Sequence, residues 1–329
     1  MNDSYSDETS ETNNTKPSIE DVIAVLQTRE GDVVPTVAYY GLSGIGSADI
    51  RKLVPVWKNL EADFRQKLLK ELAETSETNY EFDYNELAIL ALDDSNPAIR
   101  ASAIGLLWHD NSLAVLSRLI DLAENDESSA VRAAAASDLG RFILLGEYEE
   151  IPESSAVRAQ DAVVGLLTDE SEDVEVRRRA LEAISNSSHE IVSSAIEEAY
   201  ISDDRLMRVS SIFAMGRSYD QRWHDTVLRE LHSDDPEIRY EAARAAGELE
   251  LEEATSVLGQ LAVLDDRDTK MVAIWALGEI GGQLALRILN GLAEDAEDAN
   301  DDDLYEAIED AIGYATMVGS DFDFDLDDA

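Results

Sequence analysis

The segment DDPEIRYEAARAAGELE, residues 234–250, recurs along the chain at a fixed interval. DDRLMRVSSIFAMGRS stands 31 residues upstream, at 203–218, and DDRDTKMVAIWALGEIGG stands 31 residues downstream, at 265–282. Each copy has an Asp pair, then an Arg or Lys, then a run rich in small residues that contains a Gly. A fixed interval of this length indicates a repeat architecture, in which each unit packs only against its neighbours.

The Arg of this motif defines a basic column that extends over most of the chain. Beyond the strongest copies, Val33 and Tyr305 occupy the same column, and a Gly follows eight residues later in several units. We therefore expect about nine units, of which the outermost are degenerate because an array must be capped. The basic residues of the column are Arg65, Arg100, Arg132, Arg177, Arg208, Arg239 and Lys270, and the glycines are Gly41, Gly140, Gly216, Gly247, Gly278 and Gly313.

Each unit resolves into two segments of helical periodicity. The first is an apolar run such as LAVLSRLIDLAEN (113–125), and the second carries the basic column near its start. The turn between them is rich in Asp, Ser and Pro, which are typical of helix N-caps and first turns. Ala and Gly on the second segment allow close helix approach, and Gly44 and Gly281 are suited to left-handed helix ends. The sequence predicts an all-α fold, a right-handed α-solenoid of about nine helix pairs.

The same pattern assigns a structural role to the basic column. An Arg in the first turn of the second helix is positioned to bind acidic side chains or carbonyls of a neighbouring unit. We expect these contacts to form a ladder along the array. The Asp residues before each second helix are expected to cap it.

The ends of the chain differ in composition from the repeats. Residues 1–16 are polar and have almost nothing to bury, so we expect a disordered N-terminal segment. The solenoid is expected over 17–318 and an acidic tail over 319–329, where alternating Asp and Phe suit either a solubilising tail or a short docking segment.

Two stretches inside the array depart from the regular interval. RFILLGEYEEIPESS (141–155) lies in the one 45-residue interval, between Arg132 and Arg177, and is interpreted as a helix end followed by an inserted surface loop. AEDAEDANDDD (293–303) is interpreted as an extended loop.

Charge is the strongest compositional signal. The 71 acidic residues outnumber the 26 basic ones and give a formal net charge of −45. Such a surface repels nucleic-acid phosphates and anionic membranes, so we do not expect a general nucleic-acid or membrane binder. Two interpretations of the acidity remain open: adaptation to a high-salt, halophilic cytoplasm, or attraction of a basic partner. The absence of Cys, of a signal peptide and of a long apolar run predicts a cytoplasmic protein.

Three segments carry a family resemblance: DESSAVRAAAASDLG (126–140), DDPEIRYEAARAAG (234–247) and DDRDTKMVAIWALG (265–278). They resemble HEAT repeats, particularly the short HEAT-like form of phycobilin lyases and deoxyhypusine hydroxylase. The resemblance extends over about residues 18–317, and the whole chain is similar to uncharacterised prokaryotic HEAT-repeat proteins. It implies an armadillo-like α-solenoid, a fold that hosts many unrelated functions.

The resemblance also implies two enzyme classes to test against the residues. A deoxyhypusine hydroxylase-like site would take several His-Glu pairs to hold a di-iron centre, whereas this chain has one pair, His189-Glu190. We expect that pair to be solvated or to cap a helix. A phycobilin lyase-like site would require a pocket with basic groups for an acidic tetrapyrrole. Since no catalytic motif is legible, we expect no enzyme activity, cofactor or metal.

The positions one and five residues after the basic column suggest a binding surface. In three successive units they carry aromatic, Met, Val and Arg side chains, a composition typical of binding hot spots. Second helices usually line the concave face of such solenoids. The alternative is that Phe213, Met271 and Trp275 pack between repeats as core. We expect a non-enzymatic scaffold or adaptor that binds a protein partner through Val209, Phe213, Tyr240, Arg244, Met271 and Trp275.

Overall fold

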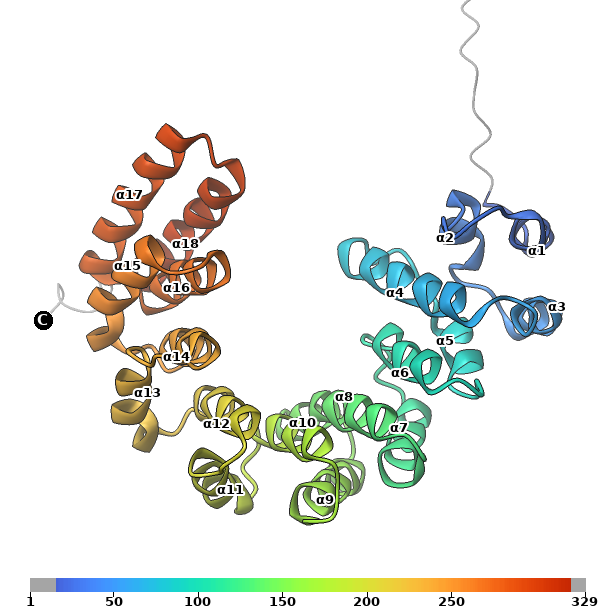
Figure 1. The fold of residues 1–329 in the computed structure, drawn as a ribbon, viewed down its shortest axis with the longest axis horizontal. Coiled ribbons are helices and arrows are strands. Elements are labelled where there is room, and N and C mark those ends of the chain that lie inside the picture. The colour runs from blue at the N-terminus through green and yellow to red at the C-terminus, as the bar shows by residue number, and fades with distance from the viewer. Residues whose placement is uncertain (1–15, 321–329) are drawn as a thin grey trace, which may run out of the picture. The chain divides into compact units, whose positions relative to one another are not determined.

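A computed structural model describes residues 16–320 of the chain, which form an all-α solenoid of paired helices (Figure 1). The described residues contain 18 α-helices, two short 3-10 helices and no strand, which confirms the predicted fold class. The first 15 residues of the predicted disordered segment, and the acidic tail from residue 321 onward, lie outside the described residues. No helix between residues 16 and 320 is both long and apolar enough to cross a membrane.

The chain divides into two compact units, residues 1–115 and 116–329. In the described part of the N-terminal unit, three helix pairs stack so that the first helices form one layer and the second helices the other (Figure 1). Leu53, Leu68 and Leu87 are completely buried between the layers. The helices are α1 (Ile19–Thr28), α2 (Thr36–Leu42), α3 (Ser47–Trp57), α4 (Ala62–Thr78), α5 (Asn85–Ala91) and α6 (Pro97–Leu106), followed by α7 (Leu113–Asn125), which leads into the next unit.

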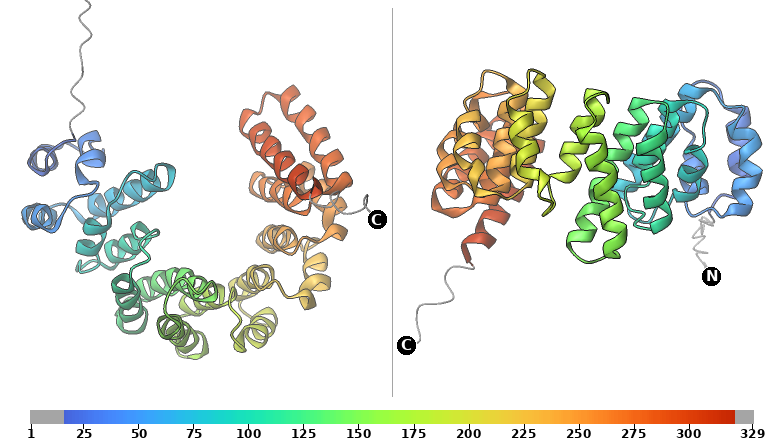
Figure 2. Two further views of the ribbon diagram at one scale, coloured as in Figure 1. Left: turned by 180° about the vertical axis from the view of Figure 1, so that it is seen from behind. Right: turned by 90° about the horizontal axis from the view of Figure 1, so that it is seen from below.

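The C-terminal unit continues the pairing in two layers. Its even-numbered second helices lie on the concave side of the unit and its odd-numbered first helices on the convex side (Figures 1 and 2). The helices are α8 (Ser129–Glu147), α9 (Glu153–Thr168), α10 (Val174–Ile184), α11 (Ile191–Tyr200), α12 (Arg205–Arg217), α13 (His224–Glu230), α14 (Pro236–Glu248), α15 (Thr255–Leu264), α16 (Arg267–Ile280), α17 (Gly282–Ala299) and α18 (Asp302–Ser320), with 3-10 turns η1 (Gln221–Trp223) and η2 (Glu252–Ala254).

The predicted Asp caps are present at four successive second helices. Each capping carboxylate accepts a hydrogen bond from a backbone N–H in the first turn, at 2.8–3.1 Å. These bonds satisfy donors that have no partner inside the helix, and they fix where each helix begins. The caps are Asp173 on α10, Asp204 on α12, Asp235 on α14 and Asp266 on α16.

The caps set the register of the basic column. From α4 to α18, the column residue is the fourth residue of every second helix, and Tyr305 keeps this position in α18. The assignment of Val33 to the column is wrong, because α2 begins only at Thr36 and Val33 is an exposed residue of the preceding loop. The first pair therefore has a shortened second helix, as befits the end of an array.

The column forms a ladder of two kinds of contact. Arg100, Arg132, Arg208 and Arg239 each donate to the backbone carbonyl six residues earlier, at 2.7–2.9 Å, and so hold the turn of their own pair. Arg177 donates to the carbonyl of Leu167 at 3.2 Å. The contacts to carbonyls thus lie within one helix pair, whereas the sequence predicts them between neighbouring helix pairs.

Carboxylates accept the hydrogen bonds that the basic column makes between successive helix pairs. Arg132 binds Glu172 with two hydrogen bonds of 2.6 and 2.8 Å, and Arg239 binds Asp265 at 2.8 and 2.9 Å. Arg65 pairs with Asp94 through one contact, from Nη1 to Oδ2. Each carboxylate belongs to the turn of the following pair, so that one guanidinium connects two turns. The Lys270 side chain forms no hydrogen bond or ion pair with a residue in 16–320.

The Gly column allows successive second helices to touch. A Cβ atom on Gly247 would lie 2.9 Å from Cα of Ala276 on the next second helix, closer than real Cβ contacts. Gly216 and Gly278 meet Ala245 and Ala311 in the same way, at 2.8 and 3.0 Å. Gly281 ends α16 with a φ of 65°, as expected of its position. The small residues therefore set the interhelical distance, which confirms their predicted role.

Both predicted internal loops are mostly helical. The stretch 141–155 lengthens α8 to 19 residues, and only residues 148–152 remain as a turn before α9. Gly146 near the end of α8 packs closely against Ala156. A Cβ atom on Gly146 would lie only 2.3 Å from the Ala156 side chain. The acidic stretch 293–303 continues α17 to Ala299, where Asn300 in the left-handed conformation ends it. Acidic side chains were mistaken for a loop signal, although Glu and Ala are good helix formers.

Candidate functional site

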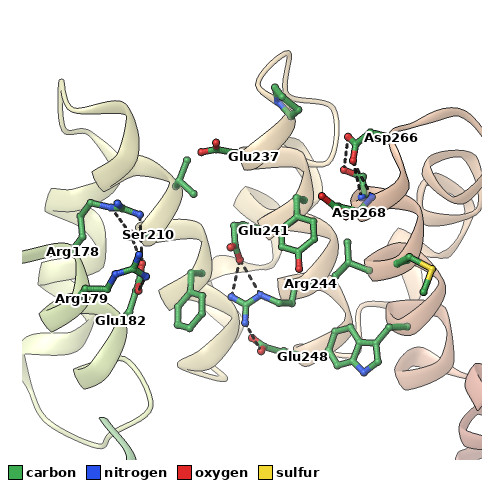
Figure 3. A pocket seen from close by; sticks show the side chains of 18 residues that line it. Arg178, Arg179, Glu182, Ser210, Glu237, Glu241, Arg244, Glu248, Asp266 and Asp268 are labelled. Atoms are coloured by element: carbon green, nitrogen blue, oxygen red, sulfur yellow. Dashed lines mark hydrogen bonds and ion pairs between the residues drawn. The ribbon is translucent and has the colours of Figure 1, made fainter. Parts of the chain in front are cut away.

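A pocket of about 860 Å³ lies on the second-helix layer of the C-terminal unit. Its walls come from four successive second helices, α10, α12, α14 and α16 (Figure 3). The volume lies within the range of small-molecule and side-chain binding pockets. The structure brings all six predicted contact residues to its lining: Val209, Phe213, Tyr240, Arg244, Met271 and Trp275.

The apolar lining residues differ in exposure. Val209 is buried, with 7% of its surface accessible, so that it contributes more to packing than to contact. Tyr240 and Met271 are half-buried, whereas Trp275 is 38% exposed. Trp275 also touches the neighbouring repeat, since a Cβ on Gly247 would lie 2.8 Å from its ring. Inter-repeat packing and a pocket-facing surface therefore coexist in this residue, rather than excluding one another.

Arg244 occupies the centre of the pocket wall (Figure 3). Its guanidinium donates to Glu241 at 2.9 Å and to Glu248 at 3.0 Å on the same helix, α14. It also lies over the ring of Phe213 on α12, 3.9 Å from the centroid, which is a cation–π contact. Arg244 is thus held on three sides, and it fixes the shape of the wall instead of offering a free guanidinium.

A second charged cluster closes the α10 side. Arg179 pairs with Glu182 at 2.7 Å, and Arg178 donates to the hydroxyl of Ser210 at 3.0 Å. Ser210 in turn donates to Glu182 at 2.6 Å. Two hydrogen bonds of Ser210, from Arg178 and to Glu182, connect α10 to α12. Because Ser210 is completely buried, the low local dielectric strengthens them. Both arginines of this wall are therefore neutralised by carboxylates of the same helix (Figure 3).

Burial disfavours the charged form of two carboxylates in the pocket. It raises the pKa of Glu241, although Arg244 opposes the shift, and the charges of Glu182 and Glu248 raise it further. Burial likewise raises the pKa of Glu248, against the effects of Arg244 and Arg217. Burial is thus the main cause of both shifts, and the arginines oppose it only in part.

The sequence reasoning missed the carboxylates of the pocket. Glu241, Arg244 and Glu248 are spaced three and four residues apart, which places them on one helix face. This spacing was readable in the sequence and predicts the observed ion pairs. Asp268 and Glu237 at the rim carried no such signal, because acidic residues are abundant on every helix.

The residues do not assemble a recognisable catalytic group. No His lines the pocket, and the Ser210 hydroxyl is completely buried and engaged in two hydrogen bonds. His189 lies outside it, before α11, where its Nδ1 accepts a hydrogen bond from the backbone N–H of Ile191 at 3.2 Å. Within residues 16–320, no three His, Asp or Glu side chains gather into a group that could hold a metal ion.

Comparison with known families identifies HEAT repeats in two parts of the chain, residues 85–155 and 224–309. The second part contains α14 and α16, which carry Tyr240, Arg244, Met271 and Trp275 of the predicted contact residues. Comparison with curated proteins finds no match.

Several solved structures resemble the chain at low identity. YibA of Escherichia coli is 20% identical, with a TM-score of 0.42 over 83% of this chain and 98% of its own. The CpcE–CpcF complex of phycocyanin lyase from Nostoc is 19% identical, with a TM-score of 0.46 over 70% and 94%. Human deoxyhypusine hydroxylase is 16% identical, with a TM-score of 0.35 over 81% and 96%. The match to HEAT repeats covers residues 85–155 and 224–309, and the likenesses to solved structures add no functional argument.

Proposed function

We propose that the chain, which matches HEAT repeats over residues 85–155 and 224–309, is a non-enzymatic scaffold or adaptor that binds a protein through the pocket on α10, α12, α14 and α16. The observation that carries the proposal is the convergence of Tyr240, Met271 and Trp275, from two successive second helices, on one pocket. Aromatic and Met side chains that remain accessible in a concave site are typical of protein-binding surfaces. The ion pairs around Arg244 hold that site in a fixed shape, which lowers the entropy cost of binding.

The pocket also argues against the lyase-like alternative. An acidic tetrapyrrole would need cationic groups for its propionates, whereas Arg178, Arg179 and Arg244 are each paired with carboxylates of the pocket or its edge. A charge already paired in this way is costly to redirect. We propose accordingly that the chain needs no cofactor, and that it acts in the cytoplasm, as its composition predicts.

Affinity capture from the native cell lysate tests the proposal. The baits are the wild type and Tyr240→Ser/Trp275→Ser, which removes the accessible aromatics and leaves Arg244 with its carboxylates. Replacing Arg244 itself would leave Glu241 and Glu248 buried and unpaired, and would confuse loss of folding with loss of binding. Tyr148→Ser/Leu264→Ser is the matched control, since both residues are exposed and neither lines the pocket.

The proposal expects a discrete protein that the wild type and the control capture and the pocket variant loses by about tenfold or more, as for loss of central aromatic contacts. Far-UV circular dichroism establishes that all baits remain helical. A protein captured equally by the pocket variant would contradict the proposed surface. Absence of any captured protein at both low and molar salt would contradict the scaffold role itself.

A further inference from the structure

The pocket has a charge imbalance that its own residues do not correct. Three arginines and six carboxylates line it. Each arginine is engaged: Arg178 and Arg179 with Glu175 and Glu182, and Arg244 with Glu241 and Glu248. No guanidinium in the lining is therefore free to meet an anion.

Three carboxylates, Glu237, Asp266 and Asp268, lie at the rim formed by α14 and α16 (Figure 3). Asp268 forms no side-chain hydrogen bond or ion pair with a residue in 16–320. Asp266 accepts from two backbone N–H groups and the Thr269 hydroxyl in the first turn of its own helix, and Glu237 shares Arg205 with Asp235. Negative charge on this rim thus exceeds the cations that the described residues place against it.

The floor next to this rim is suited to a long cationic side chain. Tyr240, Met271 and Trp275 provide an aromatic and thioether surface on which an aliphatic stem packs and a cation lies against a ring. Arg244 already makes such a contact with Phe213, 3.9 Å from the centroid. Burial raises the pKa of Glu241, and the charges of the nearby Glu182 and Glu248 raise it further, against the effect of Arg244.

We propose that the pocket binds an Arg or Lys side chain from an exposed segment of the partner protein, with the cationic group facing Asp268 and Glu237 and the stem on Tyr240, Met271 and Trp275. The inference rests on the proposed function and names the chemistry of its partner. The net charge of −45 attracts any basic protein over long range, but attraction of that kind has no preferred site. The pocket adds specificity to this attraction, because it recognises one particular side chain of the basic protein.

A peptide-display selection tests the inference whichever protein the partner is. The probe is a library of peptides with six randomised positions between Gly-Ser spacers, selected on the immobilised full-length protein at low and at molar salt. Asp268→Asn/Glu237→Gln removes two rim charges and leaves the aromatic floor. Glu252→Gln/Glu253→Gln removes two exposed charges outside the pocket and is the control for net charge.

The wild type and the control variant are expected to enrich Arg or Lys at one or two positions by about fivefold or more, and the rim variant is expected to lose this preference. Citrulline in place of the selected Arg should abolish binding, because it keeps the shape and removes the charge. Equal enrichment of basic residues by the rim variant would overturn the inference in favour of diffuse attraction. Enrichment of acidic residues, or no enrichment, would also overturn it.

The two proposals fail in different ways. If Tyr240→Ser/Trp275→Ser loses a native partner but the peptides show no basic preference, the scaffold role stands and the cation inference falls. If the peptides show the preference but no lysate protein is captured at any salt concentration, the scaffold role falls.

Discussion

The second helices α6 and α8 carry small residues where α12, α14 and α16 carry large ones. One and five residues after the basic column, α6 has Ala101 and Gly105, and α8 has Ala133 and Ser137. The six residues at the same two positions of α12, α14 and α16 all line the pocket. These helices share their fourth-residue Arg or Lys and their pairing with a first helix, so the two positions are equivalent in each.

The comparison separates two kinds of position in a repeat. Positions that stack one pair on the next, such as the Arg column and the Gly column, recur in much of the array because they support the interfaces between pairs. Positions on the open face are not required for stacking one helix pair on the next, so their residue type is free to differ from unit to unit. A departure from the repeat at such a position is therefore a better sign of function than the repeat itself.

The largest expected effect comes from a stacking position. In Gly247→Ala, the new Cβ would lie 2.8 Å from the Trp275 ring and 2.9 Å from Cα of Ala276, so that a neighbouring helix has to move. Overpacking of this kind costs about 1–3 kcal/mol in the free energy of unfolding. Urea unfolding followed by circular dichroism at fixed salt measures it.

Gly313 is the matched control for that substitution. It has the same position in α18, the last second helix, and a Cβ there meets nothing within 4 Å among the described residues. Gly313→Ala is expected to stabilise the chain by about 0.5–1 kcal/mol, because Ala is the better helix former. Equal destabilisation by the two substitutions would contradict the division between stacking and open positions.

A smaller loss is expected from the ladder. Arg239→Gln removes the paired hydrogen bonds to Asp265 and the bond to the Ser233 carbonyl. Charge-assisted bonds are strong, but the Arg239 side chain is 21% exposed, so we expect a loss of about 1–2 kcal/mol. Lys270→Gln at the same column position is expected to cost less than about 0.5 kcal/mol, since Lys270 forms no such bond with a described residue.

The ladder also predicts a pH dependence. The hydrogen bonds from Arg239 lower the pKa of Asp265 to about 2. A carboxylate whose pKa is lower in the folded state stabilises that state above its unfolded pKa, and the stabilisation is lost as the pH falls through the folded pKa. The difference between wild type and Arg239→Gln should therefore be full at pH 6 and shrink between about pH 4 and 2. A difference that is constant over this range would contradict the role assigned to the ion pair.

The periodic part of the fold was predictable from the sequence because each unit repeats the same local chemistry. The Asp cap, the basic fourth residue and the helix-packing Gly each occur at a fixed position relative to the start of the second helix. The Asp caps observed on α10, α12, α14 and α16 confirm the predicted helix starts. At the first pair this reasoning failed. Val33 fits the spacing, but no capping residue defines a helix there, and α2 begins later.

The pocket was predictable only in outline. The spacing of the columns places Tyr240, Met271 and Trp275 on one helix layer. It does not show which side chains are accessible to a partner and which are held by contacts within the protein. The spacing of Glu241 and Glu248 predicts their ion pairs with Arg244, whereas only the three-dimensional packing shows that Phe213 on α12 also holds it. Arg244 thus lines the pocket and also supports its wall, and its role as a partner contact stays a prediction.

The most direct measurement of the central claim compares the same position on two second helices. A photoreactive benzoylphenylalanine is placed at Trp275 on α16 or at Ser137 on α8, both five residues after the basic column and both exposed. After irradiation in native lysate, the account predicts one adduct of discrete mass from position 275, suppressed by the selected Arg or Lys peptide, and none from position 137. Equal adducts from both positions, or an adduct from 137 alone, would contradict a binding site in this pocket.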